Sequence, residues 1–324
     1  MHQFRPFRAP PPAADPCPHG CILNADARIA LPSFPDKSID MILTDPPYFL
    51  DGLDGEWRKG AAESARATGT VGTLPVGMKF DPRQGRELQR FIEEIAGHWM
   101  RILKPGGFVL CFSQPRLAHR VAIAIENAGF EVRDQIAWHF RGQAQFKAFS
   151  QDHFVKKMRI SDEEKAKIIR SLSGRKTPQL RPQHESIVLA QRPREGTFVN
   201  NFMKYEVGLI DSKQSMDGKV PSNVILCEKP NPTERGQFSF EHLTPKPIAL
   251  LEHLIKVFTK EGQTVLDPFL GSGSTAVAAI RTNRRFVGIE LNAAYAYGAR
   301  ARCLEAYDGI VNAGSEGCAG PAID

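Results

Sequence analysis

The sequence predicts an α/β protein built on a mostly parallel, doubly wound sheet with helices on both faces. Strand-like apolar segments alternate with helix-like amphipathic segments along most of the chain, which is the pattern of such folds. Consecutive apolar residues in 39–44 indicate a strand buried on both faces, as in a parallel sheet. Gly271 and Gly273 stand at a strand-to-helix junction, where glycine turns open helices in these folds.

Each expected element has a local signal. Apolar residues of 86–103 recur on one helical face, and the sequence KPGG at 104–107 ends that helix. Gly129 ends a second helix at 117–128, and three acids in the first turn favour a third at 161–171. Further helices are expected at 27–31, 247–258, 274–282 and 292–306, and strands at 22–24, 39–44, 108–112, 130–140, 185–191, 264–268 and 285–290.

Four segments interrupt this alternation. Residues 1–20 are proline-rich and lack an apolar signal-peptide core, so we expect a disordered arm. Residues 49–80 lack periodicity, which is typical of a mobile, substrate-facing loop. Residues 141–235 are basic and punctuated by proline, so we interpret them as an inserted module, and 309–324 as a loose tail. The remaining ranges, 21–140 and 236–308, are expected to form the two halves of one domain, with no apolar run of transmembrane length.

Charge and cysteine usage restrict the class of protein. The chain carries a net charge of +6, and between Lys147 and Arg181 ten Lys or Arg residues outnumber four acids by the same six. Such a stretch permits a polyanionic partner. The six cysteines form no paired framework, so we expect reduced thiols and a cytoplasmic protein. Cys17, His19 and Cys21 resemble half of a metal site, but no second cluster completes it, and we expect no metal.

The segment 265–290 indicates a site for a nucleoside cofactor. A strand ends at Asp267, a turn with Gly271 and Gly273 follows, and Glu290 ends the next strand, 23 residues after Asp267. Glycines let backbone amides approach a ligand, and the helix N-terminus favours a negative group. An acid at this distance typically holds ribose hydroxyls. A dinucleotide and S-adenosylmethionine both remain open from these residues.

A second set of polar groups follows the strand at 39–44. The stretch ILTDPPYFL places Asp45, Pro46, Pro47 and Tyr48 at the carboxyl end of that strand, where open α/β sheets bind ligands. The prolines stiffen the turn and remove N–H donors. What remains is a carboxylate, carbonyl oxygens and an aromatic face, a set that suits an exocyclic amine on a flat ring. The alternative is a strand-terminating turn, with Asp45 as a cap and Tyr48 in the core.

The motif DPPY at 45–48 together with DPFLGSGS at 267–274 resembles the amino-methyltransferases of DNA. These enzymes transfer methyl from S-adenosylmethionine to adenine N6 or cytosine N4, and DPPY ahead of the glycine motif is similar to their beta group. The resemblance spans 21–306 and implies a seven-stranded methyltransferase sheet with a target-recognition region at 141–235. Supporting matches are NAD at 24–26, RILKPGG at 101–107, HLTPKP at 242–247 and VGIELN at 287–292.

The resemblance implies a role for each matching residue. Asp45 and the Pro46 carbonyl bind the target amine, Pro47 completes the motif, and Tyr48 stacks on a base flipped from the duplex. S-adenosylmethionine contacts are implied for Asp26 (adenine), Glu290 (ribose), Thr244 and Lys246 (methionine carboxylate), Asp267, Phe269, Gly271 and Gly273. Beside such a site, DNA contacts are expected at Trp57, Arg58, Lys147, Lys156, Lys157, Arg159, Arg175, Lys176 and Arg181. Trp138 either lines the base pocket or packs in the core.

These residues predict a site-specific DNA adenine-N6 methyltransferase, because Asp ahead of Pro-Pro-Tyr favours adenine in the family pattern. A cytosine-N4 methyltransferase is the alternative, and a DNA-binding regulator with a vestigial site is a further one. A glutamine-amide methyltransferase is opposed by Asp45 and by the motif order. The expected partners are double-stranded DNA and, in a restriction–modification system, a cognate nuclease. The sequence leaves a homodimer open.

Overall fold

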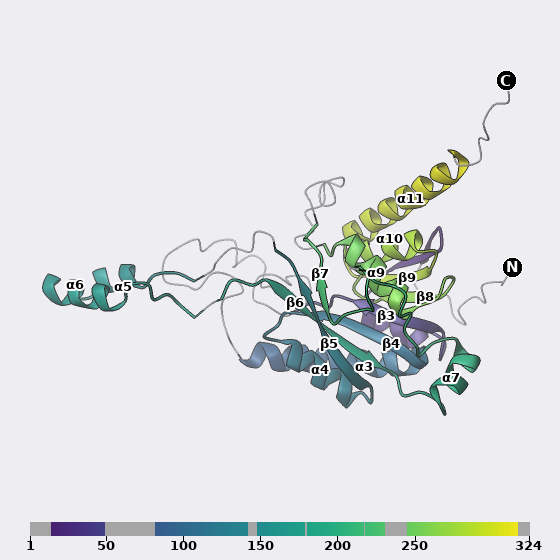
Figure 1. The fold of residues 1–324 in the computed structure, drawn as a ribbon, viewed down its shortest axis with the longest axis horizontal. Coiled ribbons are helices and arrows are strands. Elements are labelled where there is room, and N and C mark those ends of the chain that lie inside the picture. Colours follow the sequence, from purple (N-terminus) through teal and green to yellow (C-terminus); the bar gives the residue numbers. More distant parts are fainter. Residues whose placement is uncertain are drawn as a thin grey trace, which may run out of the picture.

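The computed structural model describes residues 14–48, 82–141, 148–178, 180–216, 218–230 and 245–316. The described strands form one sheet in the order β1-β2-β9-β8-β3-β4-β6-β5-β7 (Figure 1). These strands are β1 (Ala14–Cys17), β2 (Gly20–Asn24), β3 (Ile39–Thr44), β4 (Leu103–Ser113), β5 (Glu131–His139), β6 (His184–Gln191), β7 (Val224–Leu226), β8 (Thr264–Asp267) and β9 (Arg285–Glu290). The helices are α1 (Ala27–Ala30), η1 (Leu31–Ser33), α3 (Pro82–Ile102), α4 (Ala118–Asn127), α5 (Asp152–Lys156), α6 (Asp162–Ser171), α7 (Phe198–Tyr205), α9 (Ile248–Phe258), α10 (Ser274–Arg281) and α11 (Ala293–Glu316).

Most of the sheet is parallel. The strands β2, β9, β8, β3 and β4 run in one direction, and β6 runs antiparallel between β4 and β5. The mostly parallel, doubly wound fold is therefore confirmed. The expected number of seven strands is wrong, because β1 and β7 extend the two edges of the sheet. These edge strands have four and three residues, too few to show a periodic pattern in the sequence.

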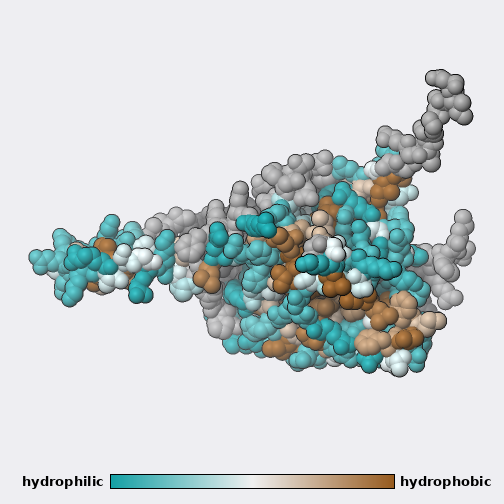
Figure 2. Space-filling model, viewed as in Figure 1, coloured by the Kyte–Doolittle hydropathy of each residue, from teal (hydrophilic) through white to brown (hydrophobic). Residues whose placement is uncertain are grey.

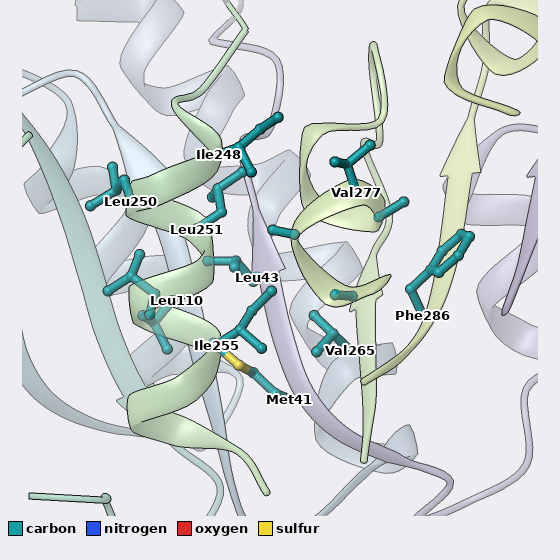
Figure 3. Close-up of a cluster of buried hydrophobic side chains, with 14 of the residues drawn as sticks. Met41, Leu43, Leu110, Ile248, Leu250, Leu251, Ile255, Val265, Val277 and Phe286 are labelled. Atoms are coloured by element: carbon teal, nitrogen blue, oxygen red, sulfur yellow. The ribbon is translucent and has the colours of Figure 1, made fainter. Parts of the chain in front are cut away.

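Two apolar layers cover the sheet, and β3 contributes to both. Met41 and Leu43 belong to the cluster beneath α9, α10 and α11, where they face Ile255 (Figure 3). Ile42 belongs to the cluster beneath α1, α3 and α4 on the other face. Successive strand residues point to opposite faces, so the run of apolar residues at 39–44 is explained by burial on both sides. Helices pack on both faces of β3, and this packing fixes the position of the carboxyl end of the strand.

The region 141–235 is not separate from the sheet. Both β6 and β7 lie within it, and they pair with β4 and β5. In contrast, α5 and α6 stand away from the sheet on a projecting arm, residues 148–178 (Figure 1). No side chain of α6 is buried. Local signals support this helix instead, because Ser161 and Glu164 form a reciprocal capping box at its start.

Both terminal boundaries differ from the sequence prediction. β1 begins at Ala14, inside the arm expected at 1–20. The last helix, α11, continues to Glu316 and so passes the start of the tail expected at 309–324. A glycine costs a helix only about 1 kcal/mol relative to alanine, so Gly309 does not end it. None of the helices in the described ranges is long and apolar enough to cross a membrane.

Candidate active site

The two sequence motifs meet at the carboxyl edge of the sheet. β3 and β8 are neighbours, with Ile42 opposite Leu266. Asp45 follows the end of β3, and Asp267 is the last residue of β8. Between them, the Thr44 hydroxyl donates a hydrogen bond of 2.7 Å to Asp267 Oδ1, although the two residues are 223 positions apart. Strand pairing thus joins the DPPY turn to the glycine motif.

Asp267 is a buried carboxyl group with an unusual pKa. Only 4% of the residue is exposed, and burial raises the pKa of its carboxyl to about 6, against hydrogen bonds from Thr275, Thr44 and the Phe269 N–H. The Phe269 N–H donates to Oδ1 over 3.1 Å. A ligand group that donates hydrogen bonds or carries positive charge would favour the ionised form. Such a carboxyl at a strand end is a candidate ligand-binding group.

Glu290 and the glycine turn form one hydrogen-bonded unit. Glu290 ends β9, next to β8, and its two carboxylate oxygens accept the Gly271 N–H at 2.7 Å and the Asn292 N–H at 2.8 Å. Gly271 and Gly273 adopt φ values of 55° and 85°, a left-handed backbone that favours glycine. A Cβ on Gly273 would lie 2.8 Å from the Cβ of Ala299. The turn therefore requires glycine for its conformation and for its packing against α11.

Phe269 extends this unit. Its half-buried ring packs against Phe91 of α3, with the ring centroids 5.6 Å apart. The glycine turn, Glu290 and Phe269 thus share the edge at which Asp267 ends β8. Tertiary structure therefore brings together these groups, all of which were expected to bind the cofactor.

Asp26 lies on the same edge, because β2 pairs with β9. Its carboxylate accepts the Arg28 N–H at 2.9 Å at the start of α1 and pairs with the Arg28 guanidinium at 2.5 Å. Burial opposes the charge of Asp26, but the hydrogen bonds and charge of Arg28 outweigh it and lower the pKa of the carboxyl. Its expected contact with the adenine of a cofactor stays a prediction.

Three charged groups, those of Asp45, Lys246 and Glu185, form a cluster at the DPPY turn. The Tyr48 hydroxyl donates to Asp45 Oδ1, and the Lys246 ammonium donates to Asp45 Oδ2. Glu185 Oε2 lies 3.3 Å from the same ammonium, which also faces the Phe112 ring at 5.2 Å. Burial opposes the charge of Lys246, but the carboxylates of Asp45 and Glu185 outweigh it and raise the pKa of the lysine.

This cluster includes contacts that the sequence did not indicate. The Lys246 ammonium contacts two protein carboxylates, and its expected contact with a methionine carboxylate stays a prediction. Glu185 was not expected in the site at all. Its position follows from the direction of β6, since an antiparallel strand begins at the edge where β3 and β4 end. The sequence HES at 184–186 carries a strand signal but gives no direction.

Trp138 belongs to the core. It is 2% exposed, and its indole N–H donates to the Cys227 carbonyl at 2.7 Å. Its ring packs edgewise against Phe112 and Phe140, with centroids 6.4 Å and 5.2 Å away. Of the two roles considered for Trp138, core packing is therefore the one the structure supports. The aromatic residues next to the cluster of charges are Tyr48 and Phe112.

The residues expected to contact DNA fall into two groups. Lys156, Lys157, Arg159, Arg175, Lys176 and Arg181 are all exposed, and all but Arg181 lie on the projecting arm. The surface of this arm is predominantly hydrophilic (Figure 2). Trp57, Arg58 and Lys147 lie outside the described residues, as does Thr244 of the expected cofactor site. Within the described ranges, no group of three or more His, Cys, Asp or Glu side chains is arranged to hold a metal ion.

Solved structures share this fold over nearly the whole chain. The cytosine-N4-specific PvuII DNA methyltransferase has a TM-score of 0.58 at 16% identity, covering 95% of this chain and 97% of that one. A putative DNA modification methylase of Thermus thermophilus complexed with S-adenosyl-L-methionine has a TM-score of 0.53 at 20% identity, covering 90% and 97%. The fold is therefore that of the α/β methyltransferases.

Sequence relatives narrow this class to a family. The N6/N4 DNA methylase family model matches residues 39–301. The Type II methyltransferase M.HindIII of Haemophilus influenzae is 30% identical over 294 residues, which cover 84% of this chain and 91% of that protein. The Type II methyltransferase M2.DpnII of Streptococcus pneumoniae is 28% identical, covering 88% and 89%. The chain belongs to the N6/N4 DNA methylase family.

Proposed function

We propose that the protein transfers a methyl group from S-adenosylmethionine to the N6 amine of an adenine flipped out of double-stranded DNA at a specific sequence. The observation that carries this proposal is the hydrogen bond between Thr44 and Asp267. It holds the amine-binding turn against the glycine motif, so that a base bound at Asp45 and a cofactor bound at Asp267 would be neighbours.

The glycine motif and Glu290 have the hydrogen-bond acceptors and the backbone conformation that suit S-adenosylmethionine, and this cofactor supplies an electrophilic methyl group on a sulfonium. Asp267 and Glu290 offer carboxylates to amino and hydroxyl groups, and Phe269 offers an aromatic face. Gly271 and Gly273 curve the backbone so that no side chain fills the turn. We assign these five residues to the cofactor site.

Asp45 and its neighbours would act on the target amine. The lone pair of an aryl amine is delocalised into the ring, which makes the nitrogen a poor nucleophile. Hydrogen bonds from the amine to Asp45 and the Pro46 carbonyl increase electron density on nitrogen and stabilise the positive charge that develops there. Tyr48 orients the carboxylate through its hydroxyl. The nitrogen gains a methyl group and loses one proton, which passes to Asp45 or to water.

The choice of adenine rests on Asp45. Asp ahead of Pro-Pro-Tyr favours adenine in the family pattern, whereas the acceptors of the DPPY turn suit any exocyclic amine on a flat ring. Cytosine N4 is therefore the second candidate. In either case the amine is buried in the duplex, and the base must be extruded to reach the turn.

DNA would be held by the basic residues of the region 141–235. Those on the projecting arm are exposed and carry side chains suited to phosphate contacts. We extend this proposal to Lys147 and, in the loop expected at 49–80, to Trp57 and Arg58.

Expression in a host without DNA methylation, followed by genome-wide mapping of modified bases, tests the proposal. We expect N6-methyladenine at one recognition sequence, and none with the Asp45→Ala variant, which should still bind S-adenosylmethionine. N4-methylcytosine would establish the second candidate. An unmodified genome, from a folded protein that binds the cofactor and DNA, would support a regulator instead.

A further inference from the structure

The catalytic carboxylate is already engaged by the protein. Oδ1 of Asp45 accepts the Tyr48 hydroxyl, and Oδ2 accepts the Lys246 ammonium. The ammonium is a full positive charge in direct contact with the group that should stabilise positive charge on the target nitrogen. An ion pair in this place weakens Asp45 as a partner for the amine. The ammonium and the target amine therefore compete for Oδ2 of Asp45.

Lys246 has a second carboxylate within reach. Glu185 Oε2 lies 3.3 Å from its Nζ atom, which is within ion-pair distance. This oxygen is buried and has no hydrogen-bond partner among the described residues. A buried carboxylate oxygen without a donor is unfavourable. Glu185 is thus ready to accept one of the three N–H groups of the lysine.

The fold holds Glu185 in this position firmly. It is the second residue of β6, paired with Trp138 of β5. The next residue, Ser186, pairs with Ser113, the last residue of β4. The pairing of β6 with β4 and β5 therefore presents the carboxylate at the edge where β3 ends.

We propose that Glu185 is a positioning residue that takes the Lys246 ammonium from Asp45 when the target amine binds. This inference rests on the proposed function. The lysine side chain is 8% exposed, and an unpaired ammonium there would be costly. With Glu185 as the receiving group, the lysine keeps a charged partner throughout, and Asp45 Oδ2 becomes available to the amine.

The Glu185→Gln variant tests this inference, since it preserves shape and removes charge. The assay is single-turnover transfer of labelled methyl from prebound S-adenosylmethionine to genomic DNA of a host without DNA methylation. We expect a rate constant about ten- to a hundredfold lower, which is less than the hundred- to thousandfold cost of removing a direct transition-state donor, with unchanged cofactor affinity. Glu195→Gln is the matched control. Glu195 follows the opposite end of β6 and contacts Lys37 and Lys204 at 2.9 Å and 2.6 Å, and its variant should transfer methyl at the wild-type rate.

A double-mutant cycle separates this role from a structural one. If Glu185 acts through the lysine, Glu185→Gln should have little further effect in a Lys246→Met protein. A wild-type rate for Glu185→Gln, or additive losses in the cycle, would overturn the inference alone. Lost cofactor affinity in Lys246→Met would also overturn it, because the lysine would then serve the methionine carboxylate. An inactive wild-type protein with bound cofactor would refute the proposed function, and this inference with it.

Discussion

Replacing Asp267 by asparagine should stabilise the folded protein at neutral pH while weakening its affinity for S-adenosylmethionine. The amide keeps an acceptor oxygen for the Thr44 hydroxyl and the Phe269 N–H, both of which donate to Oδ1. It loses the negative charge, which the hydrogen bond from Thr275 also stabilises in the wild type. Burial raises the pKa of this carboxyl from 3.8 to about 6. At about 1.36 kcal/mol per pH unit, this difference corresponds to about 3 kcal/mol.

The sign of the effect follows from proton binding. The folded protein holds the Asp267 proton to higher pH than the unfolded chain does, so this group contributes stability at low pH. That contribution is lost as the pH rises from about 4 to about 7. The asparagine variant has no such proton. Its stability relative to the wild type should therefore rise by up to about 3 kcal/mol over this range.

Urea unfolding of both proteins between about pH 4 and pH 8 measures this difference, and titration calorimetry at about pH 8 measures cofactor affinity. Asp162→Asn, at a position 97% exposed on α6, controls for the loss of one negative charge. A stability difference that does not change with pH would refute the electrostatic reasoning. Unchanged affinity for the cofactor would remove Asp267 from the proposed site.

Two further predictions concern the glycine turn and the projecting arm. Gly273→Ala should destabilise the protein by about 1–3 kcal/mol in urea unfolding, because its Cβ would meet Ala299 at 2.8 Å in a left-handed backbone. Gly309→Ala is the matched control and should not destabilise the protein, since a Cβ added there would meet no other part of the structure within 4 Å. Replacing Lys156, Lys157 and Arg159 together by alanine should weaken DNA binding and leave cofactor affinity unchanged. The dependence of DNA affinity on salt concentration should fall by the equivalent of up to about three phosphate contacts. An unaltered salt dependence would show that these residues do not contact DNA.

The elements with a strong local period were predictable from sequence. The apolar stripe of 86–103 became α3, and the apolar run at 39–44 became β3. The short edge strands β1 and β7 were missed, since three or four residues show no period. The length of α11 was missed because a single glycine is a weak stop signal.

The direction of β6 in the sheet could not be predicted from the sequence either. A strand pattern at 185–191 is the same for a parallel and an antiparallel neighbour, and only pairing with β4 sets the direction. That direction places Glu185 at the edge where β3 and β4 end. An error in strand topology therefore conceals a residue of the candidate site.

The chemistry of the two candidate sites could be predicted from the amino-acid sequence, because DPPY and the glycine motif each place their hydrogen-bonding groups within a few residues. How the two sites are joined depends on the tertiary structure. Thr44 links the two motifs through a hydrogen bond across paired strands, and Lys246 lies between Asp45 and Glu185. Such contacts depend on which strands are neighbours, and strand order is set by the packing of the whole chain.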